Sequence, residues 1–262
     1  MNDTEELHYD DAVIQFLELM WGKGYLSPGG AEEVGRLLNG INLSGKTVLD
    51  IGCGSGGISI GLIRDFGAKK VIGLDVEEPV CRFARDAAAK AGVSDQLEIR
   101  QIEPGFPIPI ESGSTDIVFS KDSIVHIEDK EALTQDVFRI LKPGGWFVAS
   151  DWLISHDGEP SSEMAAYIKS EDLGFGMASP NRYQKSLEAA GFINITLRNR
   201  NKWYTPVAEK ELERLRGPER PAFDATTGPE DIDRQTRTWA AMVEVLKTGE
   251  HCPHHFRGQK PF

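Results

Sequence analysis

The sequence predicts an α/β fold: a doubly wound, mostly parallel sheet with helices on both faces. Short apolar runs alternate with helical patterns between residues 48 and 150. The first run leads into four glycines within six residues, and the second run ends in Asp75. Alternating strands and helices are typical of βαβ units, which assemble into parallel sheets.

The strands of this region are expected at residues 47–51, 70–75, 97–102, 115–120 and 145–151. Helices are expected between them, notably at 79–91 and 130–141, and the Lys-Pro-Gly-Gly sequence at 142–145 ends the second of these. Ligands of such sheets bind beyond the carboxyl ends of the strands. Polar residues stand at five of these ends, namely Asp50, Asp75, Glu103, residues 120–122 and Asp151.

Segments on both sides of this region are expected to cover the site. Residues 7–21 place apolar side chains at helical spacing, and residues 21–30 are rich in Gly and Pro, so a helix and a loop would form a lid. A short helix at 31–38 follows. Beyond Asp151 the pattern predicts helices at 161–173 and 181–190 and a strand at 192–197. A charged helical cover is expected at 205–247, with a loop at 216–227. A last strand at 255–258 is expected to form an antiparallel edge hairpin with 192–197.

Composition and charge restrict the function. The chain has 262 residues, of which 40% are hydrophobic, and a net charge of −12. Nucleic-acid binding through phosphates needs clustered Lys and Arg, so a small-molecule substrate is favoured. No apolar run approaches the roughly 20 residues that span a bilayer, and the N-terminus lacks the basic region of a signal peptide. We expect a cytoplasmic protein without a membrane partner.

The cysteines and histidines do not indicate a metal site or a disulfide framework. Cys53, Cys81 and Cys252 are odd in number and widely spaced. The sequence His-Cys-Pro-His-His at 251–255 is too short to present three ligands tetrahedrally, and no second cluster supports it. No metal is expected.

The glycine-rich turn after the first strand predicts a cofactor site. Gly52 and Gly54 allow backbone amides to approach a ligand closely. Their spacing, with Asp50 two residues before the first glycine, differs from the G-x-G-x-x-G pattern of dinucleotide-binding proteins. Asp75, at the end of the second strand, is placed to bind ribose hydroxyls. The alternative for Asp75 is capping of the next helix.

These motifs resemble those of the class I S-adenosylmethionine (SAM) methyltransferases, which have a Rossmann-like fold, over about residues 40–200. The segments 9–30, 119–126 and 239–256 also resemble the phosphoethanolamine N-methyltransferases, and that likeness covers nearly the whole chain. The resemblance implies SAM as cofactor. It further implies a lid helix and loop at 1–39, a SAM-binding core with inserted cover helices at 40–200, and a helical cover with a final edge strand at 201–262.

The resemblance also assigns cofactor contacts. Asp50, Gly52 and Gly54 would hold the methionyl end of SAM, and Asp75 would hold the ribose. Glu103 stands where the family usually has an aspartate that accepts the exocyclic amine of adenine, with the Ile102 amide beside it. The methionine part would be flanked by Ser27 and by the segment from Ser120 to Asp122.

The family's catalytic pair, a tyrosine on the lid helix and a histidine after the fourth strand, matches Tyr9 and His126. Methyl transfer to nitrogen needs a free lone pair, whereas an amine in water is mostly protonated at neutral pH. A histidine can accept that proton, and a phenol can orient the histidine or the amine. The alternatives are core packing for Tyr9 and a backbone-satisfied helix start for His126.

The expected acceptor site departs from the family. Its phosphate-binding arginine, tyrosine and lysine correspond here to Glu171, Leu173 and Met242, none of which can bind a dianion. We therefore expect a small unphosphorylated amine as substrate, contacted by Glu171, Met242, Tyr25 and Asp151. A shifted alignment in which Lys169 or Arg182 reaches the phosphate keeps phosphoethanolamine as an alternative.

Other functions stay open at this point. The chain could methylate sulfur or carbon of a small metabolite, or bind SAM without catalysis, because a fold does not fix a function. A monomer or a homodimer is expected, and the sequence does not identify the methyl acceptor.

Overall fold

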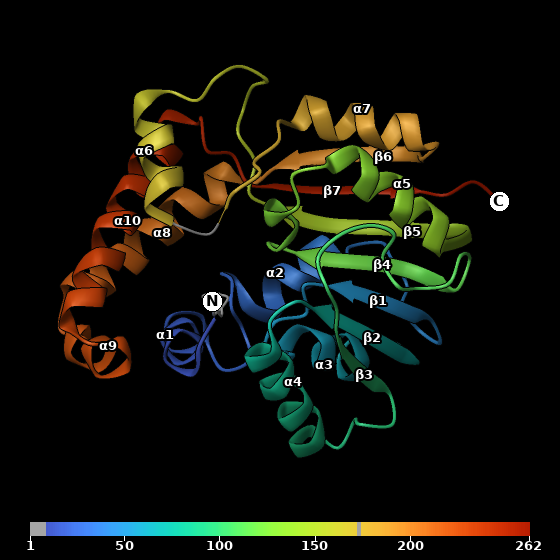
Figure 1. The fold of residues 1–262 in the computed structure, drawn as a ribbon, viewed down its shortest axis with the longest axis horizontal. Coiled ribbons are helices and arrows are strands. Elements are labelled where there is room, and N and C mark those ends of the chain that lie inside the picture. Colours follow the sequence, from blue (N-terminus) through green and yellow to red (C-terminus); the bar gives the residue numbers. More distant parts are fainter. Residues whose placement is uncertain (1–8, 172–173) are drawn as a thin grey trace, which may run out of the picture.

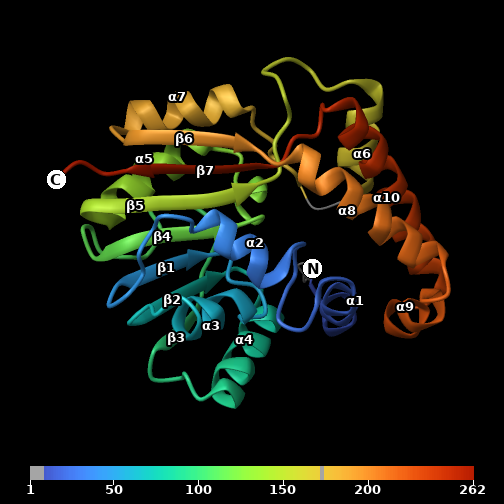
Figure 2. The same cartoon turned by 180° about the vertical axis from the view of Figure 1, so that it is seen from behind.

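The computed structural model describes residues 9–171 and 174–262, which form a seven-stranded sheet with helices on both faces (Figures 1 and 2). The strand order is β3-β2-β1-β4-β5-β7-β6. The first five strands run parallel, and β7 is antiparallel to both β5 and β6. The strands are β1 (Thr47–Ile51), β2 (Lys70–Asp75), β3 (Leu97–Gln101), β4 (Thr115–Lys121), β5 (Leu141–Asp151), β6 (Ile193–Asn199) and β7 (His254–Gln259). The predicted fold class is confirmed.

Two apolar layers fill the faces of the sheet. On one face α5 and α7 bury Leu133, Val137 and Leu187 against the strands, and on the other α2, α3 and α4 contribute Val34 and Leu62 among others. The helices are α1 (Asp11–Trp21), α2 (Gly30–Leu37), α3 (Gly57–Arg64), α4 (Glu78–Ala91), the 3-10 helix η1 (Ile124–His126), α5 (Lys130–Ile140), α6 (Ser162–Glu171), α7 (Pro180–Ala190), α8 (Asn201–Arg216), α9 (Arg220–Thr227) and α10 (Pro229–Thr248).

A third apolar cluster joins the lid helix to the cover. In Figure 1 α6, α8 and α10 lie together beyond the carboxyl ends of the strands, with α1 and α9 at the same edge. Phe16 of α1 packs edge-on against Phe223 of α9 at 5.7 Å and against Trp239 of α10 at 5.8 Å between ring centroids. The two ends of the chain therefore share one core.

Two sequence expectations differ from the structure. The loop expected at 216–227 is wrong, because α9 occupies most of it. Pro221 stands in the first turn of α9, where its missing N–H costs no hydrogen bond, and Phe223 is fully buried in the cover. Strand β5 begins at Leu141 rather than at residue 145, and its pairing with β4 shifts register between Thr115 and Ile117.

The edge hairpin is confirmed, with β7 between β5 and β6. His254 to Gln259 pair with β5 on one side and with β6 on the other. Because β7 is antiparallel to β5, its first residues, His254 and His255, lie next to the carboxyl end of β5. The cover is thereby attached to the same sheet edge that carries the predicted site.

Candidate active site

The turn after β1 passes close to the end of β2. Gly52 and Gly54 have φ of 72° and 53°, a left-handed backbone that favours glycine. A Cβ on Gly52 would lie 1.8 Å from Ser123 Oγ, so no other residue fits there. The Gly54 N–H donates to Asp75 Oδ2 at 2.9 Å. The turn and the second strand-end acid are therefore directly linked.

Two predicted cofactor residues support this turn from inside the protein. Asp50 is buried and accepts a hydrogen bond from Ser59 Oγ at 2.5 Å. Burial raises the pKa of Asp50 to about 7. The buried Ser120 hydroxyl donates to the Ile51 carbonyl at 2.8 Å, which ties β4 to β1. Neither side chain lines the cavity at this edge.

A cavity of about 480 Å³ lies at the carboxyl edge of the sheet, a size typical of small-molecule sites. Because β3 and β2 are followed by β1 and β4 in the sheet, residues after β2 and β3 line one end and residues after β4 line the other. The predicted residues in its wall are Tyr9, Ser27, Gly52, Gly54, Asp75, Ile102, Asp122 and His126.

The end after β2 and β3 combines an acid with apolar side chains. Asp75 lines it, and burial raises the pKa of this carboxyl. Asp75 Oδ1 also accepts from the Glu77 N–H at 3.2 Å, so the local capping role and a ligand role coexist. Val76 and Phe106 line the same end although 46% and 38% exposed. Sequence reasoning missed both residues. For Val76 a signal was present, because it is an apolar residue directly after the strand-end acid Asp75.

Glu103, predicted to contact adenine, is exposed and does not line the cavity. The segment after β3 instead turns Ile102, Phe106 and Ile108 towards the cavity. Such apolar side chains suit the flat face of an adenine ring.

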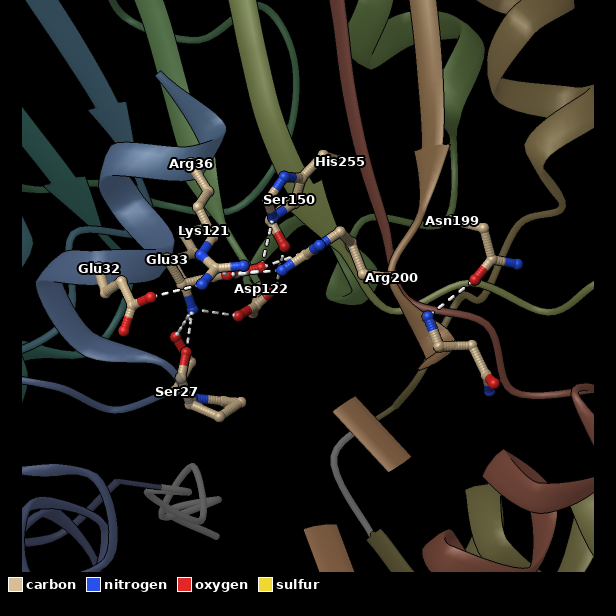
Figure 3. Close-up of polar contacts among 12 residues, drawn as sticks. Ser27, Glu32, Glu33, Arg36, Lys121, Asp122, Ser150, Asn199, Arg200 and His255 are labelled. Atoms are coloured by element: carbon tan, nitrogen blue, oxygen red, sulfur yellow. Dashed lines mark hydrogen bonds and ion pairs between the residues drawn. The ribbon is translucent and has the colours of Figure 1, made fainter. Parts of the chain in front are cut away.

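The end after β4 is built on an ion pair between consecutive residues (Figure 3). Lys121 Nζ lies 2.5 Å from Asp122 Oδ2, and Ser150 Oγ donates to the other carboxylate oxygen of Asp122 at 2.6 Å. The φ of Asp122 is 58°, a left-handed conformation that turns the chain sharply after the strand. Lys121 also contacts the lid loop at Ser27. Lys121 belongs to the predicted segment 120–122, but sequence reasoning did not predict its contact with the lid loop.

The structure brings Tyr9 and His126 to the wall of one cavity. His126 ends η1, and its ring lies 5.4 Å from that of Phe175. Tyr9 is within electrostatic reach of Asp75 and Glu171, and burial in particular raises the pKa of its phenol. The phenol therefore stays protonated at neutral pH and can donate a hydrogen bond.

The four predicted substrate residues lie on four different segments of the chain. Glu171 is near Tyr9. Burial raises the pKa of Glu171 to about 7, although a hydrogen bond from the Tyr167 hydroxyl acts to lower it. Met242 is buried in the cover core. Asp151 is buried in the main core, where it accepts from the Tyr183 hydroxyl at 2.7 Å, and Tyr25 packs near Asp65. None of the four lines the cavity, and Leu173 lies outside the described residues.

The charged residues of the cavity wall are mostly acidic. Within the described parts of the chain, Lys121 is the one cation among them, and the acids are Asp75, Glu77, Asp122, Glu128 and Asp129. Arg182 does not line the cavity, since it pairs with Glu131 and donates to the carbonyl of the wall residue Glu128, and Lys169 is exposed. The wall therefore favours cations over anions.

Neither a metal centre nor a membrane span is found in the described ranges. No group of three or more His, Cys, Asp or Glu in residues 9–171 and 174–262 could hold a metal ion. None of the helices in these ranges is both long and apolar enough to cross a membrane.

Residues 42–201 match the model of a methyltransferase domain family, and the chain belongs to this family. It is 32% identical over 247 residues to phosphoethanolamine N-methyltransferase 1 of Triticum aestivum, covering 94% of this chain and 48% of that protein. The chain spans about half the length of the curated plant relatives it matches.

Solved structures show the same fold. Phosphoethanolamine N-methyltransferase 2 of Haemonchus contortus, in complex with phosphomonomethylethanolamine and S-adenosylhomocysteine, superposes with a TM-score of 0.86 at 25% identity, covering 97% of this chain and 59% of that chain. A proposed sarcosine dimethylglycine methyltransferase from Galdieria sulphuraria gives 0.79 at 21% identity, covering 96% and 99%. The protein is thus a class I methyltransferase with SAM as its cofactor.

The described residues fit that cofactor. The glycine turn and Asp75 line the same wall of the cavity, Asp75 offers a carboxylate for ribose hydroxyls, and the apolar end suits adenine. An acidic wall also suits a sulfonium cation.

Proposed function

We propose that this protein transfers the methyl group of SAM to the nitrogen of a small, unphosphorylated amine. The observation that carries the proposal is the presence of Tyr9 and His126 in the wall of the cavity that also contains Asp75 and the glycine turn. SAM supplies the methyl group as an electrophile. The protein must then provide a deprotonated amine in line with it.

His126 and Tyr9 would divide this work. A neutral imidazole can accept the proton of an ammonium and expose the lone pair that attacks the methyl carbon. Because the pKa of Tyr9 is raised, its phenol is a hydrogen-bond donor rather than a base. Tyr9 would therefore orient His126 or the acceptor, and His126 would hold the released proton.

The charge of the site supports an unphosphorylated acceptor. A phosphate dianion would lose its hydration beside the acids of the wall, and Lys121 already pairs with Asp122. Glu171 adds a buried carboxyl near Tyr9, and none of the groups that shift its pKa is a cation. A neutral or cationic group at that end of the acceptor is favoured.

Phosphoethanolamine is the second candidate. The identity of about 30% to the plant phosphoethanolamine N-methyltransferases favours it. A binding cation would then have to come from a rearranged lid or cover, because Lys169 and Arg182 do not line the cavity.

A substrate screen tests the proposal. Small amines, amino acids, thiols and phosphoethanolamine are incubated with SAM, and S-adenosylhomocysteine release is measured. Asp75→Ala, which lacks the ribose ligand, serves as the blank. We expect turnover with unphosphorylated amines that His126→Ala strongly lowers. Exclusive turnover of a thiol or of phosphoethanolamine would contradict the proposal, and so would no turnover by a protein that binds SAM.

A further inference from the structure

The ammonium of Lys121 contacts three groups at the site (Figure 3). The Lys121 side chain is 2% exposed. Its Nζ donates to Ser27 Oγ at 2.7 Å, to the Pro28 carbonyl at 2.9 Å and to Asp122 Oδ2 at 2.5 Å. An ammonium has three N–H donors, so these contacts use all of them. Lys121 therefore fastens the lid loop to the carboxyl end of β4.

The contact with Lys121 determines what the Ser27 hydroxyl can do. Its oxygen accepts a hydrogen bond from Lys121, and its own O–H has no acceptor among the described residues. A hydroxyl that accepts from a cation becomes a better donor, because hydrogen bonds in a chain polarise one another. Ser27 also lines the cavity. It is therefore prepared to donate to an anionic oxygen of a ligand.

The layout of the cavity indicates which oxygen that is. Asp75 and the apolar residues after β2 and β3 suit adenosine, so the methionyl part of SAM faces the end after β4. That part carries an α-carboxylate. Since the other charged residues of the described wall are acids, the carboxylate is best received next to Lys121.

Asp122 compensates the buried ammonium. Without a counter-charge, a lysine this buried would be destabilised by lost hydration. Ser150 holds the second oxygen of Asp122 at 2.6 Å, which fixes the carboxylate. The Lys121 ammonium consequently has one defined position relative to the lid loop.

We propose that Lys121 is a positioning residue for the cofactor, which directs the Ser27 hydroxyl to the α-carboxylate of SAM and holds the lid loop over it. The inference rests on the orientation of SAM in the proposed function. It does not depend on which acceptor is methylated, so it can hold even if the proposed amine acceptor is wrong.

The test compares two ligands that differ in the carboxylate. Calorimetry measures the affinities of SAM and decarboxylated SAM for the wild type, Lys121→Met, Lys121→Arg and Ser27→Ala. Loss of a charge-assisted hydrogen bond predicts a fall of about tenfold or more for SAM in Lys121→Met and Ser27→Ala. In the same two variants, we expect the affinity for decarboxylated SAM to change less than about threefold. Lys121→Arg should retain part of the affinity for SAM.

Lys142→Met is the matched control, because Lys142 is bound to Asp116 at the other end of β4 and lies outside the cavity wall. It should bind both ligands like the wild type. If Lys121→Met loses the same affinity for both ligands, Lys121 has a merely structural role. If Lys121→Met binds SAM with the wild-type affinity, Lys121 has no role in cofactor binding. If Lys121→Met does not fold, Ser27→Ala decides, since equal losses for both ligands, or no loss, would overturn the proposal.

Discussion

The buried ion pair between Glu33 and Arg200 holds helix α2 against the junction of β6 and α8 (Figure 3). Arg200 Nε and Nη2 each donate to a different Glu33 oxygen at 2.8 Å, and the side chains are 6% and 4% exposed. Replacing Arg200 with Met leaves a buried carboxylate. Breaking such a pair costs about 3 to 5 kcal/mol.

The remaining partners of Glu33 place the expected loss near the lower end of this range. His255 Nε2 lies 2.9 Å from Glu33 Oε1, and Arg36 Nε lies 3.9 Å from Oε2. We expect Arg200→Met to lower the free energy of unfolding by about 3 kcal/mol. In a protein of this size, that corresponds to roughly 6 to 12 °C in Tm.

Urea unfolding and calorimetry of a double-mutant cycle measure this loss. Glu33→Gln and Arg200→Met should each destabilise, and the double variant should lose less than their sum, since it buries no unpaired charge. Arg82→Met, which removes an exposed pair with Asp11, is the control and should cost less than about 1 kcal/mol. Additive losses, or a loss for Arg200→Met no greater than for the control, would refute the reasoning.

The same pair predicts a pH dependence. His255 and Arg200 outweigh the desolvation that opposes them, so the pKa of Glu33 is below its usual value in the folded protein. A carboxyl with a lowered folded pKa stabilises the fold above its unfolded pKa of about 4.3, and this stability is lost as the pH falls through the folded pKa. The difference in unfolding free energy between the wild type and Arg200→Met should therefore be largest at neutral pH and shrink below about pH 4. A difference that grows on acidification would contradict this account.

Four further predictions concern the site. Asp75→Ala should abolish SAM binding in calorimetry with the fold retained by circular dichroism, and wild-type affinity would contradict the cofactor assignment. His126→Ala and Tyr9→Phe should each lower kcat roughly 10²-fold with SAM affinity little changed, and the double variant should be little worse than the worse single one. Glu171→Arg combined with Met242→Lys should raise kcat/KM for phosphoethanolamine about ten- to a hundredfold, whereas efficient use by the wild type would show that another cation reaches the phosphate. If the acceptor is cationic, its KM should rise as the pH falls below about 7, where Glu171 becomes protonated, and Glu171→Gln should remove this dependence.

The sheet was predictable because its signals are local. Apolar runs that end in glycine or an acid predict the bounds of four of the five parallel strands to within one residue. The start of β5 was missed because residues 142–145 were taken only as a helix stop, although a strand with irregular pairing can include such a sequence. Helix α9 was missed because its stability depends on Phe223, whose burial is a tertiary property.

The site was less predictable, because strand-end position does not determine which way a side chain points. Asp50 and Asp75 both end strands, yet only Asp75 lines the cavity. Glu103 occupies a position expected to face adenine but is exposed to solvent. The contacts of Lys121 were not predictable from local sequence, because its partners Ser27 and Pro28 are more than 90 residues away in the chain.

The two halves of the reaction depend on different parts of the fold. The residues that fit the methyl donor lie at the ends of β1, β2 and β4, where the turn glycines and the parallel pairing leave little freedom. The residues proposed to face the acceptor lie on α6, α10 and the segment before α1, which pack with one another in the apolar cluster of the cover. A change of charge on α6 would alter the charge offered to the acceptor without changing the sheet edge. A chain about 30% identical to phosphoethanolamine N-methyltransferases can therefore keep the donor site while its acceptor changes.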